Sequence, residues 1–245
     1  MIKTKFLVII ASVLFFQNSY SQKTDFSKYA IAMSEITTFA DNPGFKDEVT
    51  LENSSKEIKW VTGEDGYSYT QDIEYIRVFG YKVLFESNNN LIIGVYYDSE
   101  GTATYSYLFN VTTTENKLVL NQVIGGGDRC HNAVILDEVE LENNILSYST
   151  LITPFKLMTW FSKPDKETSF DDCMVCCIGF ANFKYDLINQ TLNFESIRVI
   201  KETLQEGTAI KKTYDDFVKE RPLNLSLLLT QEELKEFIKA CLKNH

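Results

Sequence analysis

Short runs of β-branched and aromatic residues, separated by turn residues about every eight to twelve positions, extend from Val49 to Val199. Runs at 91–97, 102–110, 118–124 and 133–141 alternate with turns, and later hairpins are expected to turn at 142–144 and 189–190. Because no helical crossovers separate these runs, they predict antiparallel sheet. The expected fold is mainly β, an antiparallel meander arranged as a sandwich, a partly open barrel or an irregular propeller-like assembly.

Helices are expected only at the two ends of this β region. Apolar residues between positions 26 and 36 recur at three- and four-residue steps, which predicts a short N-terminal helix. Near the C-terminus, Thr230 and Glu233 have the spacing of a capping box and predict an amphipathic helix at about 230–243. Its apolar stripe, expected to pack on the sheet, consists of Leu234, Phe237, Ile238, Cys241 and Leu242.

The first 21 residues have the three parts of a secretory signal peptide. Lys3 and Lys5 precede an apolar run of eleven residues at 6–16, after which the chain becomes polar. Ser19 and Ser21 are the small residues that signal peptidase requires for cleavage ahead of Gln22. We therefore expect a signal peptide at 1–21 and a single secreted or periplasmic β-rich domain over 22–245. The apolar run is too short for a membrane span, and none is predicted elsewhere.

Charge limits the partners of the mature chain. The whole sequence has 34 acidic and 24 basic residues. Removal of Lys3 and Lys5 leaves 22 basic residues, and 22 minus 34 gives a net charge of −12. Such a chain repels nucleic acids and anionic membrane surfaces, so neither is an expected partner.

Five cysteines carry the sharpest structural prediction. Cys241 lies on the apolar stripe of the last helix and is expected to be a free buried thiol. The other four are disulfide candidates in an exported chain: Cys130, Cys173, Cys176 and Cys177. Adjacent cysteines rarely pair, so the preferred pairing is Cys130 to Cys177 with Cys173 to Cys176. Pairing of Cys130 with Cys176 or with Cys173 stays open.

Two other interpretations of these cysteines are less favoured. Cys173 and Cys176 have the spacing of a redox pair, but the residues that follow indicate a strand instead of the helix that activates such a thiol. A zinc site built from Cys130, His131 and two cluster cysteines conflicts with oxidation outside the cytoplasm. No metal or other cofactor is predicted.

Motifs for catalysis are scarce. The sequence contains no serine-hydrolase elbow, no Walker loop and no metalloprotease helix. The glycines at 125–127 precede β-rich sequence where a phosphate loop needs a helix, so they indicate a turn. Adjacent acids at 171–172 and 215–216 offer carboxylate pairs, although solvation or helix capping explains such pairs more often. No catalytic residue is assigned.

The candidate ligand contacts fall in two segments. Trp60, Tyr67 and Tyr69 flank the turn at 63–66, and their rings can stack on a sugar or on a partner protein, although core packing is commoner. Asp128, Arg129 and His131 surround Cys130. The leading hypothesis is an exported, non-catalytic binding or interaction protein, braced by disulfides, whose partner is a protein or glycan of the cell envelope or extracellular space. The alternative is a hydrolase of envelope polysaccharide that uses a carboxylate pair.

Overall fold

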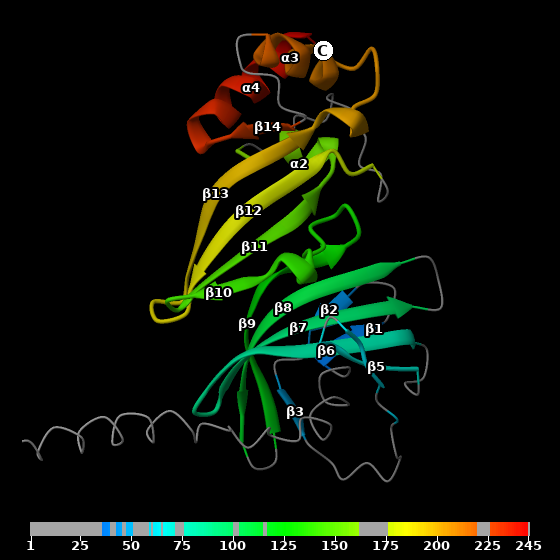
Figure 1. The fold of residues 1–245 in the computed structure, drawn as a ribbon, viewed down its shortest axis with the longest axis vertical. Coiled ribbons are helices and arrows are strands. Elements are labelled where there is room, and N and C mark those ends of the chain that lie inside the picture. The colour runs from blue at the N-terminus through cyan, green and yellow to red at the C-terminus, as the bar shows by residue number, and fades with distance from the viewer. Residues whose placement is uncertain are drawn as a thin grey trace, which may run out of the picture.

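The computed structural model describes residues 36–39, 43–45, 48–50, 59, 61–64, 66–71, 76–99, 103–114, 117–161, 176–219 and 226–244. The predicted signal peptide and all but the last residue of the predicted N-terminal helix lie outside these ranges. Within them the protein is mainly β, as predicted, with two antiparallel sheets, a two-stranded ribbon and no closed barrel (Figure 1).

The first sheet has seven strands, and the last six of them in the sequence form a meander. Its strands, in spatial order, are β3 (Glu48–Thr50), β9 (Lys117–Asp128), β8 (Thr104–Thr113), β7 (Asn90–Ser99), β6 (Ile76–Ser87), β5 (Ser68–Thr70) and β4 (Val61–Thr62). Residues 106–111 of β8 are buried without interruption, so both faces of this central strand are covered. One face packs beside Ile36, which precedes the ribbon of β1 (Thr37–Phe39) and β2 (Pro43–Phe45).

The second sheet has five strands and two chemically different faces. Its strands, in spatial order, are β10 (Glu140–Glu142), β11 (Ile145–Ile152), β12 (Gly179–Asp186), β13 (Thr191–Ile200) and β14 (Ser226–Leu229). On the polar face, Ser149 donates to Asn182, whose amide donates to Ser196, across three neighbouring strands. Alternate residues of β11, which include Leu146 and Ile152, are buried on the opposite face.

This apolar face is covered by different partners at its two ends. At the far end, residues such as Ile152 and Val199 form a core with the helices α2 (Pro154–Met158), α3 (Ala209–Val218) and α4 (Gln231–Asn244). At the near end, Leu146 packs against Ile92 and Leu108 of the seven-stranded sheet. Figure 1 shows this arrangement, with α3 and α4 at the end of the molecule away from the seven-stranded sheet.

The predicted C-terminal helix is confirmed. The amide of Glu233 donates to the Thr230 hydroxyl over 3.4 Å, and the Thr230 amide donates to the Glu233 carboxylate over 2.9 Å. Four residues of the predicted stripe are buried, but Leu242 is 48% exposed, so the apolar contact ends one residue earlier than expected. None of the helices in the described part of the chain is long and apolar enough to cross a bilayer.

Two local predictions were wrong. The expected strand at 133–141 is interrupted by the 3-10 helix η1 (Leu136–Glu138), and only the short edge strand β10 follows it. The glycines at 125–127 do not form a turn, because they pair with residues 106–108 inside β9. Their missing side chains serve packing: a Cβ on Gly125 would lie 2.8 Å from the Tyr148 ring. The helix α3 and the 3-10 turn η2 (Lys201–Thr203) were not predicted.

Candidate functional site

A cavity of about 580 Å³ opens at the junction of the two sheets. The face of the seven-stranded sheet that carries Tyr96 and Ser106 forms one wall. The segment between β9 and η1, which includes Ala133 and Val134, forms another wall, and Leu151 of β11 contributes from the second sheet. The volume lies within the range of about 300–1,000 Å³ that is typical of small-ligand sites.

Two tyrosines lie flat across the sheet because two glycines leave room for them. A Cβ on Gly80 would lie 2.6 Å from ring carbons of Tyr69, and a Cβ on Gly94 would overlap the Tyr67 hydroxyl. The two rings lie 6.1 Å apart between centroids, and the Lys82 ammonium sits 5.4 Å from the centre of the Tyr67 ring. Both tyrosines line the cavity, so these glycines shape an aromatic wall.

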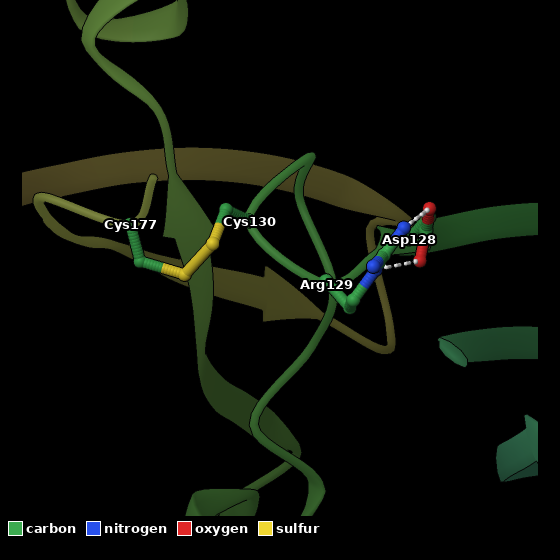
Figure 2. Close-up of a disulfide and its surroundings, with 4 residues drawn as sticks. All are labelled: Asp128, Arg129, Cys130 and Cys177. Atoms are coloured by element: carbon green, nitrogen blue, oxygen red, sulfur yellow. Dashed lines mark hydrogen bonds and ion pairs between the residues drawn. A yellow bond between two sulfur atoms is a disulfide. The ribbon is translucent and has the colours of Figure 1, made fainter. Parts of the chain in front are cut away.

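Arg129 lines the cavity with its charge already paired. Its Nε and one terminal nitrogen donate to the two carboxylate oxygens of Asp128 over 3.0 and 3.1 Å, as Figure 2 shows. These hydrogen bonds raise the pKa of Arg129 further above its usual value. Asp128 also accepts a 3.1 Å hydrogen bond from the Thr104 amide. The pair is therefore a rigid part of the wall with little net charge.

Figure 2 also shows a disulfide between Cys130 and Cys177. Both cysteines line the cavity. The disulfide joins the loop after β9 to the residues before β12, with the two Cα atoms 4.9 Å apart and the two cysteines 47 positions apart in the sequence. The preferred pairing for Cys130 is thus confirmed, and its alternatives are excluded. Cys176 is also disulfide-bonded, and its predicted partner Cys173 lies outside the described residues.

The remaining sequence candidates lie in different places. Asp128 does not line the cavity as described, but its carboxylate holds the Arg129 side chain that does. In the same loop, the amide of His131 donates to the Asp128 carbonyl over 2.8 Å. Trp60 lies outside the described residues. Tyr96 was not predicted from the sequence as a ligand contact, and its neighbour Tyr97 points to the opposite face of the sheet. Successive side chains of a strand point to opposite faces, so the strand predicted at 91–97 already implied that Tyr96 and Tyr97 lie on different faces.

Other candidates for chemistry are occupied or buried. Cys241 is a free thiol whose burial raises its pKa to about 11. Asp215 and Asp216 lie within α3, where they pair with Lys211 over 2.5 Å and with Lys219 over 2.6 Å. The pair Asp171–Asp172 lies outside the described residues. The part of the chain that the structure describes contains no cluster of three or more His, Cys, Asp or Glu side chains arranged for a metal ion.

The chain matches none of the models of known protein families, none of the curated proteins and none of the solved structures with which it was compared.

Proposed function

We propose that this protein is an exported binding protein that takes an apolar or ring-shaped group of its partner into the cavity between the two sheets. The observation that carries the proposal is the meeting of Tyr67, Tyr69 and Tyr96 around one cavity of about 580 Å³. Tyrosines on rigid strands offer large contact surfaces at a low cost in conformational entropy.

The polar groups of the wall support an apolar occupant. The Arg129 guanidinium is held by Asp128, and the Ser106 hydroxyl donates to the Val134 carbonyl over 2.7 Å. The wall therefore presents mainly carbon to the interior, from residues such as Ala133 and Leu136. A group that enters gains by apolar contact, because the wall has few open hydrogen-bonding positions to satisfy.

Export is the second part of the proposal. It depends on the signal peptide predicted at 1–21, and the Cys130–Cys177 disulfide is consistent with an oxidising compartment. In that setting the group bound is a side chain of an envelope or extracellular protein, or a ring of a glycan. Sequencing of the secreted protein tests the export step, and a mature N-terminus at Gln22 is expected.

Titration with the neutral fluorescent probe N-phenyl-1-naphthylamine tests the cavity. Ala133 is 6% exposed and lines it, so Ala133→Phe fills the space that the probe would occupy. We expect the wild-type protein to enhance probe fluorescence saturably and Ala133→Phe to weaken the affinity at least about tenfold. Tyr69→Leu removes an aromatic ring from the wall without filling the cavity, so it is expected to weaken the probe affinity less than Ala133→Phe does.

Leu228→Phe is the matched control, because it adds aromatic surface at a half-exposed position of β14 away from the cavity. Its probe affinity should equal that of the wild type. Circular dichroism shows whether each variant is folded. Equal affinities for the wild type and a folded Ala133→Phe would refute the cavity as the binding site.

The alternative, a polysaccharide hydrolase, needs two carboxyl groups that face one sugar bond. Asp137 lines the cavity, whereas the nearby Asp128 carboxylate is engaged by Arg129. Release of reducing ends from envelope polysaccharide, lost on Asp137→Asn, would replace binding with hydrolysis as the function. Unchanged polysaccharide together with saturable probe binding supports the binding protein.

A further inference from the structure

A second cavity of about 430 Å³ lies on the apolar face of the five-stranded sheet. It occupies the space between the two cores that cover the ends of this face, because Tyr148 belongs to the core at the sheet junction and Trp160 packs on the helical core. Thr150 and Leu151 are neighbours on β11 that line different cavities, Thr150 the second and Leu151 the first. The second cavity is therefore a separate site.

Aromatic rings form one wall of this second cavity. Phe183 stacks on Tyr148 with the ring centroids 5.3 Å apart and contacts Trp160 with the centroids 6.0 Å apart. Phe194 supports Trp160 from behind at 5.1 Å between centroids. The rings hold one another in place, which makes a preformed surface for a flat or chair-shaped ring.

Three polar side chains in the lining have no partner within the described part of the chain. Thr150 is only 4% exposed, yet its hydroxyl makes no hydrogen bond there. The Asn132 amide likewise makes none, and the Lys156 ammonium has no ion pair among the described residues. Thr150 is buried and Asn132 and Lys156 are half-buried, and all three line the same cavity, so a ligand with complementary polar atoms would find partners there.

We propose that this second cavity binds an acidic pyranose, a sugar ring that carries a carboxylate. The ring stacks on the aromatic wall, its hydroxyl groups bond to Thr150 and Asn132, and its carboxylate pairs with Lys156. Lys156 is the only charged residue among the described residues that line the cavity, which favours an anion over a cation.

The net charge of the chain, −10 for the full sequence, opposes an anionic ligand at long range. Charges more than about 8–10 Å away are largely screened at physiological salt, whereas a contact with Lys156 inside the cavity is not. The local cation therefore decides the preference. Binding should persist at physiological ionic strength.

Isothermal titration calorimetry with trigalacturonate and with its methyl ester tests the site. The wild type is expected to bind the acid about tenfold more tightly than the ester, because the ester loses the charged contact. Lys156→Met should weaken binding of the acid about tenfold and leave the ester unchanged, and Lys156→Arg should restore most of the affinity for the acid. Thr150→Val, which leaves the internal hydrogen bonds intact, should weaken both ligands severalfold.

Lys184→Met is the matched control. Lys184 lies on the polar face of the same sheet, where it pairs with Glu195 over 2.6 Å, and its loss changes the net charge by the same amount. Its affinity for the acid should equal that of the wild type. Equal binding of acid and ester, an unaffected Lys156→Met, or no heat of binding at millimolar ligand would each overturn the proposal. Because the probe that tests the first cavity is neutral, either site can fail without the other.

Discussion

The hydroxyl of Tyr148 on β11 donates a 2.9 Å hydrogen bond to the carbonyl oxygen of Ile124 on β9, and so joins the two sheets. Tyr148 is 3% exposed, and burial raises its pKa above the usual value for a tyrosine. Gly125, which follows Ile124 in β9, lies under the Tyr148 ring, and a Cβ on Gly125 would lie 2.8 Å from a ring carbon of Tyr148. The Tyr148 side chain therefore depends on two adjacent residues of β9: Ile124 accepts its hydrogen bond, and Gly125 leaves room for its ring.

Tyr148→Phe should destabilise the fold by about 1–2 kcal/mol, because the ring keeps its packing while the buried Ile124 carbonyl loses its donor. Urea unfolding followed by circular dichroism measures the change. Tyr96→Phe is the control, since the Tyr96 hydroxyl makes no hydrogen bond among the described residues, and it should stay within about 0.5 kcal/mol of the wild type. Equal effects of the two substitutions would contradict a bond that joins the sheets.

Replacement of both Cys130 and Cys177 by alanine should lower the free energy of unfolding by about 4 kcal/mol. The disulfide closes a loop of 47 positions, and the chain entropy that it removes from the unfolded state corresponds to this amount. Chemical unfolding of the oxidised protein and of the double variant gives the difference. Mass spectrometry of unreduced peptides checks the bond itself, and a free thiol at Cys130 would refute it.

Gly80→Ala should destabilise the fold by about 1–3 kcal/mol and weaken probe binding in the first cavity, because the added methyl group displaces the Tyr69 ring. The same substitution in a Tyr69→Ala background removes the collision and should cost clearly less. A double-mutant cycle by urea unfolding measures this coupling. Additive effects would show that Gly80 and Tyr69 do not constrain each other.

Cys241 should make the fold less stable in alkali. Its pKa is about 11 in the folded protein against 9.0 for an ordinary thiol, because burial disfavours the thiolate. The stabilisation is complete below pH 9, and about 3 kcal/mol is lost as the pH rises from 9 to 11, because only the unfolded chain releases the proton. Cys241→Val should show a shallower decline over this window in pH-dependent unfolding, and the buried tyrosines, present in both proteins, cancel. Parallel declines would contradict the raised pKa.

Local sequence patterns predicted much of the fold for identifiable reasons. Runs of β-branched and aromatic residues between turn residues predicted strands such as β8 and β11, because such side chains pack well on the surface of a sheet. Thr230 and Glu233 predicted the start of α4, because the capping box depends on residues within one turn. Predictions failed where contacts between distant residues determine the structure. A strand was predicted at 133–141, yet η1 forms within this segment.

The candidate site was only partly predictable. Tyr67, Tyr69 and Arg129 were chosen by residue type, and the structure brings them to one cavity. Nothing local connects Tyr69 with Gly80, because their proximity follows from the pairing of β5 with β6. The polar side chains of the second cavity had no sequence signal, because threonine, asparagine and lysine are ordinary residues outside their tertiary setting.

By itself, the sequence determined the succession of strands and turns, the capped last helix and the pairing of Cys130 with the 173–177 cluster, because each depends on short-range spacing or on arithmetic among five cysteines. Only the tertiary structure decided that the two sheets meet around Tyr148 and leave one tyrosine-lined cavity and one with unengaged polar groups. The physical reason is that a cavity is a relation among surfaces far apart in the chain. Its shape and the set of side chains that line it exist only once strand register and sheet packing have been set.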